Sequence, residues 1–396
     1  MYLTSIEYQE HQGTSNYWSV KKLEFGNVNL IVGKNSSGKS RIINIINALA
    51  VSLAGRAAPF GSGSWSAEFE RQKGLQREPQ VYKVEFKDTA IVHESFKVKS
   101  NTVMERGASG EGYVASRKGG RVKYQVPRDR LMAVMRSDPY QHPQFEHLKI
   151  WSTSLCVYRF GSEFGKGSLT MQNQPSPAGG QQDGLDMAAA VDNASNVFLM
   201  THAKFGFDFE FSVLQDLESI GYPCTYVGMH PIQNINFAGS FPLGLAVKEA
   251  GLACLTTQND MSQGMYRALA LIVQVNANIL WAQSRKVGRE LLPGDSPMII
   301  IDDIGEGLDF DRSKRLIHLL VQKALKYKIQ LIMSSNDRFI MNDVPLEYWT
   351  VLHREGSVVR PFNYMNSKSV FDEFEYLGLN NFDFFSHEYF KASSQG

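Results

Sequence analysis

A glycine-rich loop near the N-terminus constrains the possible folds of this 396-residue chain more than any other feature. The loop matches the Walker A pattern G-x-x-x-x-G-K-S and consists of Gly33, Lys34, Asn35, Ser36, Ser37, Gly38, Lys39 and Ser40. A predicted strand with apolar residues at Val28, Leu30, Ile31 and Val32 precedes it, and apolar residues follow at helical spacing between positions 42 and 53. In this arrangement, backbone N–H groups and a helix N-terminus bind phosphate. The loop therefore predicts a nucleotide-binding α/β domain, and an ordinary glycine-rich turn is the alternative.

Two side chains of the loop have predicted roles of their own. Lys39 would reach the β- and γ-phosphates of a nucleoside triphosphate, and the Ser40 hydroxyl would hold Mg²⁺. The other loop residues would contact phosphate mainly through their backbone, and Arg41, which follows directly, is a further candidate.

A second nucleotide motif lies near the C-terminus. Residues 298–301 form an apolar run that ends in Asp302 and Asp303, which is the Walker B pattern. We predict that Asp302 binds the metal ion, through water, and that Asp303 is the general base for the attacking water. Glu306 is the next carboxylate to consider, and a polar exit from a strand is the alternative interpretation.

Composition excludes several classes of protein. Hydrophobic residues at 43% and aromatic residues at 11% are typical of a globular chain, and the net charge of +1 creates no global field for nucleic acid or membrane. The three cysteines are far apart, so neither a zinc site nor a disulfide framework is predicted. With no signal peptide or membrane span in the sequence, we expect a cytoplasmic protein that does not contact a membrane.

The order of predicted elements divides the chain into three segments. Period-two patterning between residues 65 and 126 predicts an antiparallel sheet. We predict a first segment at 1–127, an inserted helical segment at 128–240 with a mobile loop at 161–184, and a last segment at 241–396, in which helix and strand alternate.

Two further stretches resemble ABC-type ATPases. Residues 304–309, Ile-Gly-Glu-Gly-Leu-Asp, resemble the D-loop that follows Walker B in that family. Residues 261–265, Met-Ser-Gln-Gly-Met, resemble the signature L-S-G-G-Q, although Ser262 could also be a plain helix cap. The resemblance implies a head-to-tail dimer in which Ser262, Gln263 and Gly264 bind the γ-phosphate held by the other subunit. It also implies that Asp309 contacts the opposite nucleotide site.

The same resemblance suggests roles for several further residues. Asn336 stands where the family has a switch histidine, and its amide can donate to a γ-phosphate, but it could equally cap the next turn. Gln125 and Gln141 are both candidates for the glutamine that couples the nucleotide to the inserted segment. Tyr17 or Trp18 could stack on adenine, or pack in the core.

More than 200 residues separate Ser40 from Ser262, and this separation resembles the RecF/SMC-like soluble branch of AAA-type ATPases. The implied fold is an α/β P-loop ABC-type ATPase head with a parallel core sheet, an antiparallel β subdomain and an inserted mainly helical subdomain. Members of this branch act in DNA repair and in anti-phage defence of the OLD type, whose appended nuclease domain we do not find in this sequence.

We therefore expect an ATP- and Mg²⁺-dependent ATPase that closes a homodimer, or a higher homo-oligomer, and controls an effector protein supplied in trans. The family resemblance implies anti-phage defence as the context. The alternatives are a RecF-like repair ATPase that contacts DNA or RNA through the basic stretch 116–130, a scaffold stabilised by bound nucleotide, and a transporter subunit. The aromatic and acidic segments 371–376 and 382–385 could dock a partner or pack on their own domain.

Overall fold

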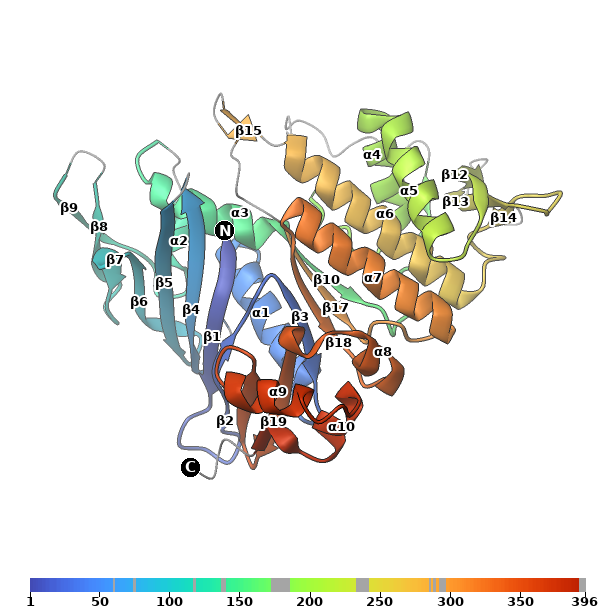
Figure 1. Ribbon diagram of the computed structural model, residues 1–396. Helices are drawn as coiled ribbons and strands as arrows, with labels where there is room; N and C mark the ends of the chain where they lie inside the picture. Colours follow the sequence, from blue (N-terminus) through green and yellow to red (C-terminus); the bar gives the residue numbers. More distant parts are fainter. Residues whose placement is uncertain are drawn as a thin grey trace. The chain divides into compact units, whose positions relative to one another are not determined.

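The computed structural model describes residues 1–59, 61–73, 76–116, 119–136, 140–171, 186–232, 242–284, 286–287, 290–291 and 297–391. The chain forms two compact units (Figure 1). Unit 1 contains Met1–Leu155, Pro293–Met298 and Gln330–Gly396, and unit 2 contains Cys156–Leu292 and Ile299–Ile329. The three-segment division at residues 127 and 240 stays a prediction, and most of the predicted mobile loop, residues 172–185, lies outside the described residues.

The sheet of unit 1 is built around strand β3 (Val28–Val32), whose five residues are all buried. Strands β18 (Gln330–Ser334) and β19 (Trp349–Glu355) flank β3, and both run parallel to it. Beyond β19 the sheet continues through β20 (Val358–Asn363), β2 (Trp18–Glu24) and β1 (Tyr2–Glu10). The mainly apolar sequence of β3 fits this position, because a parallel strand inside a sheet is buried on both faces, and its polar residue, Asn29, donates to Gly26 O and Leu331 O.

From β1 to the end of the sheet every neighbouring pair of strands is antiparallel, as the alternating pattern of residues 65–126 predicts. Strand β1 pairs with β4, and from β4 to β9 each strand pairs with the next one along the chain, so that this half of unit 1 is a meander (Figure 1). The strands are β4 (Gly63–Lys73), β5 (Gln76–Lys87), β6 (Ala90–Val98), β7 (Asn101–Arg106), β8 (Glu111–Ala115) and β9 (Arg121–Gln125).

Helix α1 (Lys39–Leu53) buries the isoleucine and leucine side chains that its sequence places on one face. The other helices of unit 1 are α2 (Met132–Met135), α3 (Glu146–Ser154), α8 (Arg338–Asp343), α9 (Lys368–Glu375) and α10 (Asn381–Ser386). Short 3₁₀ turns lie at Pro143–Phe145 and Leu346–Tyr348. Phe371 and Phe384, with ring centroids 4.5 Å apart, pack within the unit, so this part of the C-terminal aromatic sequence forms a local core.

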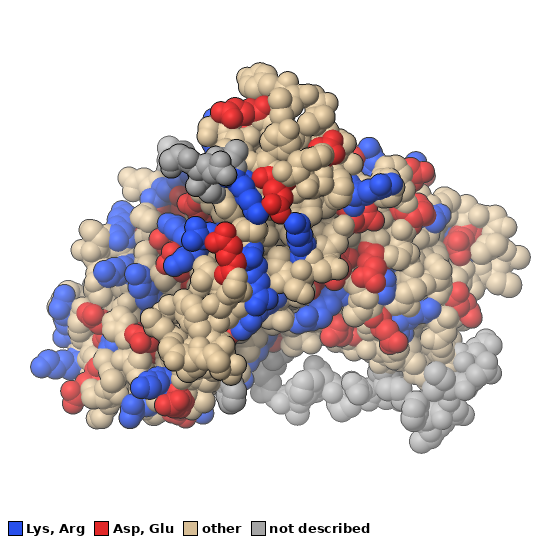
Figure 2. All heavy atoms as spheres, turned by 90° about the horizontal axis from the view of Figure 1, so that it is seen from below, with Lys and Arg blue, Asp and Glu red and all other residues tan. Residues whose placement is uncertain are grey.

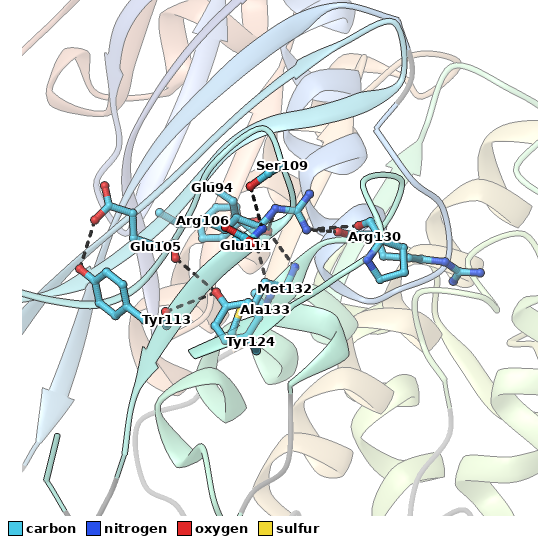
Figure 3. Close-up of polar contacts among 12 residues, drawn as sticks. Glu94, Glu105, Arg106, Ser109, Glu111, Tyr113, Tyr124, Arg130, Met132 and Ala133 are labelled. Carbon is cyan, nitrogen blue, oxygen red and sulfur yellow. Dashed lines mark hydrogen bonds and ion pairs between the residues drawn. The ribbon is translucent and has the colours of Figure 1, made fainter. Parts of the chain in front are cut away.

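A buried polar cluster fastens α2 to the antiparallel strands (Figure 3). Glu94 of β6 is fully buried and accepts three hydrogen bonds, from Tyr82 Oη at 3.0 Å, Met132 N at 2.8 Å and Ala133 N at 3.0 Å. Arg106 Nε lies 3.7 Å from the Glu94 carboxylate, and both side chains are inaccessible to solvent. Burial raises the pKa of Glu94.

Unit 2 combines a small sheet with long helices. Helix α6 (Gln263–Ser284) is buried along most of its length and packs against α4 (Ala194–Phe205) and α5 (Phe207–Ser219). Gly206 separates α4 from α5. Strand β13 (Pro242–Glu249) pairs with β11 (Thr170–Met171), β12 (Cys224–Pro231) and β14 (Thr256–Thr257).

The remaining elements of unit 2 carry the second nucleotide motif. Strands β10 (Leu155–Arg159) and β17 (Met298–Asp302) are neighbours, and α7 (Phe310–Tyr327) follows the loop after β17. A two-stranded ribbon consists of β15 (Lys286–Val287) and β16 (Glu290–Leu291). In the described part of the chain, every helix is too short or too polar to cross a lipid bilayer.

Candidate nucleotide site

The Walker A loop leaves β3 at Gly33 and enters α1 at Lys39. Two of its positions require glycine. A side chain at Gly33 would approach Ser37 Oγ to 2.4 Å, and Gly38 has φ +107°, which L-residues rarely adopt. Ser37 N donates to Lys34 O at 3.0 Å, so the backbone curls between these residues. The loop therefore has the curled backbone that directs N–H groups toward an anion.

Lys39 is buried although it carries a charge, and only 7% of the residue is exposed to solvent. Its Nζ atom donates to Gly33 O at 2.9 Å, which holds the ammonium group against its own loop. Ser37 Oγ is also buried, and it has no hydrogen-bond partner among the described residues. A buried hydroxyl without a partner is costly, and an oxygen-rich ligand in the loop would satisfy it. The Ser40 hydroxyl lies at the exposed start of α1.

Asn336 lies beside the Walker A loop. Strands β18 and β3 are parallel, so their carboxyl ends meet at one edge of the sheet. Asn336 Nδ2 donates to Asn35 Oδ1 at 3.2 Å. The cap of α8 is Asp337, whose carboxylate accepts from Phe339 N at 2.7 Å, so the capping role that we considered for Asn336 belongs to its neighbour.

Trp18 and Arg41 lie close together near Gly38, where the Walker A loop enters α1. Trp18 is 2% exposed, and its ring lies 3.3 Å from the position that a side chain at Gly38 would occupy. Arg41 stacks on this ring at 4.2 Å and pairs with Glu10. Trp18 thus packs beneath the loop as a core aromatic, whereas Tyr17 lines a cavity of about 190 Å³ and keeps part of its surface exposed.

A second cavity in unit 1, of about 310 Å³, is lined by the Walker A loop and by the C-terminal part of the chain. Glu388 and Lys34 both line this cavity, and the Glu388 carboxylate lies 2.7 Å from Lys34 Nζ. Hydrogen bonds from Lys34 and Lys391 lower the pKa of Glu388 to about 2. Arg354 Nη1 donates to Ser36 O at 3.3 Å. The sequence carries no signal for Glu388, because a single half-buried glutamate 354 residues from its partner belongs to no motif.

The signature segment, residues 261–265, begins α6 in unit 2. Ser262 Oγ accepts from Met265 N at 3.2 Å, so Ser262 caps the helix. Ser262 is nevertheless exposed to solvent. A side chain at Gly264 would lie 2.4 Å from Gly307 O. The glycine therefore lets the D-loop, residues 304–309, pass directly against the signature segment.

Asp302, the last residue of β17, and Asp303, the next residue, occupy different environments. Asp302 is 6% exposed, and its backbone oxygen accepts from Phe160 N at 2.9 Å. Asp303 has φ +55°, a left-handed conformation that is uncommon for residues other than glycine. Such strain often accompanies a functional site, because the surrounding structure must hold it.

Asp309 ends the D-loop and caps α7. Its carboxylate accepts from Arg312 N at 3.0 Å and lies 2.9 Å from Arg312 Nη1. The backbone hydrogen bond from Arg312 lowers the pKa of Asp309, which keeps the carboxylate ionised. The side chain is about half exposed.

The predicted site residues thus fall into two groups. Unit 1 gathers the Walker A loop, Arg41 and Asn336, and unit 2 gathers the signature segment, Asp302, Asp303 and the D-loop. Gln125 ends β9 and Gln141 lies in a turn, both exposed, so the choice between them stays open. Of the basic stretch 116–130, residues 117 and 118 lie outside the described part, and Arg121 stacks on Tyr113 at 4.2 Å.

Comparison with known families identifies the first part of the chain. Residues 16–136, which include the Walker A loop, match the family described as an AAA domain. This part of the chain is similar to AAA domains. The predicted relationship to AAA ATPases is therefore confirmed, and with it the α/β P-loop fold; the defence and repair subtypes stay predictions. The AAA domain match covers less than a third of the chain. No curated protein matches the chain in sequence.

Several solved structures are similar to the chain at low identity. One is an SMC head bound to the C-terminal winged-helix domain of ScpA, with 16% identity, a TM-score of 0.48, and coverage of 91% of this chain and 97% of that one. The SMC head domain of Thermotoga maritima has 14% identity and a TM-score of 0.41, over 91% and 98% of the two chains. A subunit of an ABC transporter complex from Clostridium perfringens, cbiO1, has 10% identity and a TM-score of 0.37, over 90% and 87%. Likenesses at this level do not transfer a function to the chain.

Proposed function

We propose that the protein binds ATP with Mg²⁺ and hydrolyses it to ADP and phosphate. The observation that carries the proposal is the Walker A loop of the AAA domain, with its buried Lys39, its unpartnered Ser37 hydroxyl and the neighbouring Asn336 amide. Loop N–H groups and the dipole of α1 favour an anion at this position. Lys39 would exchange its bond to Gly33 O for phosphate oxygens, and Asn336 would donate to the γ-phosphate.

The remaining roles follow from the chemistry of the residues. Ser40 and Asp302 carry hydroxyl and carboxylate oxygens of the kind that Mg²⁺ prefers and would hold the ion, which would neutralise charge on the phosphates. Asp303 would accept a proton from the water whose oxygen attacks the γ-phosphorus, and ADP leaves. Its left-handed backbone would hold the carboxylate in a defined direction.

We further propose that a second copy of the chain completes the site. Ser262 and the backbone of Gln263 and Gly264 lie at the N-terminus of a 22-residue helix, where an anion is favoured. The Walker A loop and the signature segment would then face each other across a head-to-tail dimer, with Asp309 at the interface. The dimer would close on ATP, reopen after hydrolysis, and pass this motion to an effector protein supplied in trans, as in an anti-phage system.

Substitutions at Lys39 and Asp303 test the proposal. In Lys39→Ala, loss of the ammonium group should abolish ATP binding, measured by calorimetry. In Asp303→Asn, binding should persist while turnover falls about 100-fold or more, because a general base typically contributes that much, and an ATP-bound dimer should accumulate in sedimentation experiments. Lys87→Ala, at an exposed lysine of β5, is the control and should behave as the unsubstituted protein.

The outcomes separate the alternatives. If Asp303→Asn hydrolyses ATP at the normal rate, Asp303 is not the base, and Glu306 would be substituted next. ATP retained without turnover by the unsubstituted protein would support the nucleotide-stabilised scaffold instead. Salt-dependent DNA binding that weakens when Arg121 and Lys123 are neutralised would support the repair hypothesis. Lys and Arg side chains are intermixed with Asp and Glu on the face drawn in Figure 2.

A further inference from the structure

An arginine in α6 has no role in the nucleotide contacts proposed above, and yet it is among the most extensively bonded side chains of unit 2. Arg267 lies five residues after Ser262 and is 9% exposed. It donates three hydrogen bonds, from Nε to Ser162 O at 2.8 Å, from Nη1 to Glu306 O at 2.8 Å and from Nη2 to Gly161 O at 3.0 Å. All three acceptors are backbone carbonyl oxygens, so the guanidinium group holds main chain rather than another side chain.

These carbonyl groups belong to two loops that are far apart in sequence. Gly161 and Ser162 follow β10, whereas Glu306 lies within the D-loop. Arg267 therefore joins both loops to the helix that begins with the signature segment. Hydrogen bonds from a charged donor are stronger than neutral ones, and all three of these bonds are partly shielded from solvent.

Two glycines show how closely the parts approach one another. A side chain at Gly307 would lie 2.7 Å from Arg267 Nη1, and one at Gly161 would lie 2.3 Å from Glu306 Oε2. Gly307 also has φ +83°, so the D-loop turns at this point in a conformation that favours glycine. The backbone of the D-loop is consequently in direct contact with the guanidinium group.

The loop after β10 is tied to the start of α6 by further bonds. Lys166 Nζ donates to Met261 O at 2.6 Å, Gln263 Nε2 donates to Glu163 O at 3.2 Å, and Tyr266 Oη donates to Gly165 O at 3.0 Å. Both sides of the signature segment are thus anchored to residues 161–166. Arg267 extends this set of bonds to the D-loop, because its third acceptor is the backbone oxygen of Glu306.

We propose that Arg267 is a positioning residue that sets the D-loop in a fixed relation to the signature segment. Ser262 and Asp309 then move as one body, and both reach the nucleotide site of a second subunit together. The inference rests on the proposed function, because it assigns those two residues to the partner's site. Arg267 itself does not touch the nucleotide.

The test uses the full chain with Arg267→Met, which keeps most of the side-chain volume but removes all donors. Backbone amide exchange of residues 304–308 should quicken about tenfold, since the D-loop loses the charged hydrogen bond to Glu306 O. The ATPase kcat should fall about tenfold while ATP affinity of Walker A stays unchanged. Arg315→Met, at an exposed arginine of α7, is the control and should change neither quantity.

Two further variants keep the test decisive. Arg267→Lys retains one charged donor and should restore part of the exchange protection and of kcat. Gly307→Ala disturbs the same contact from the other side and should reproduce the Arg267→Met result. These two variants decide the outcome if Arg267→Met does not fold.

Unchanged D-loop exchange in folded Arg267→Met would overturn the inference. So would faster exchange accompanied by a normal kcat. If the unsubstituted protein has no ATPase activity, the proposed function fails by that observation, whereas the exchange measurement still shows whether Arg267 holds the D-loop.

Discussion

The contact between the signature segment and the D-loop can be tested most directly at Gly264. A methyl group at this position would lie 2.4 Å from Gly307 O and 3.2 Å from Leu308 Cδ2. Ordinary contact begins near 3.4 Å, so Gly264→Ala requires the D-loop backbone to move by about 1 Å. Both neighbours belong to the loop that we expect to reach the second nucleotide site.

Two effects of this substitution oppose each other. Alanine in a helix is more favourable than glycine by about 0.5–1 kcal/mol, because alanine loses less backbone conformational freedom than glycine when the chain folds. Forcing a methyl group into a filled space costs about 1–3 kcal/mol. The clash is with backbone, which cannot rotate away, so we expect the upper part of that range and a net destabilisation of about 1–2 kcal/mol.

The assay is thermal and urea unfolding, together with ATP turnover. Gly107→Ala is the matched control, since a side chain there meets nothing within 4 Å, and it should leave stability nearly unchanged. A Gly264→Ala protein as stable as the original, with normal amide exchange at Leu308, would refute the packing argument. Normal turnover despite a displaced D-loop would refute the functional part.

Three other predictions concern unit 1. Lys34→Met should raise the pKa of Glu388 from about 2 toward its ordinary value of 4.5, measured by NMR titration of the carboxyl carbon, because one of two hydrogen-bond donors is removed. The depressed pKa means that this pair stabilises the fold above about pH 4.5 and that its contribution is lost as the pH falls toward 2; an unchanged titration would contradict the pairing. Glu94→Ala should lower the free energy of unfolding in urea by about 3–5 kcal/mol, because Arg106 would stay buried without its counter-charge, and a loss below about 1 kcal/mol would show that the cluster is unimportant. Asp337→Ala should cost about 1 kcal/mol through loss of the α8 cap, and Asp337→Asn should restore most of it.

Local motifs were sufficient to predict much of this protein. The Walker A pattern predicts strand, loop and helix because only glycine allows the backbone to curl and leave at Gly38 with φ +107°. The period-two pattern of residues 65–126 likewise predicts an antiparallel sheet, because side chains of a strand alternate between a buried and an exposed face. Such features depend on residues close together in the chain, so the sequence determines them by itself.

Contacts between distant segments were decided only by the tertiary structure. Arg267 gives no sequence signal, since its acceptors are backbone carbonyl groups and any residue supplies one. The need for glycine at position 264 follows from the path of Gly307, more than 40 residues later. The pairing of Lys34 with Glu388 depends on where the C-terminal helices pack. The sequence determines which chemical groups the chain carries, whereas the packing of remote elements determines which of these groups meet.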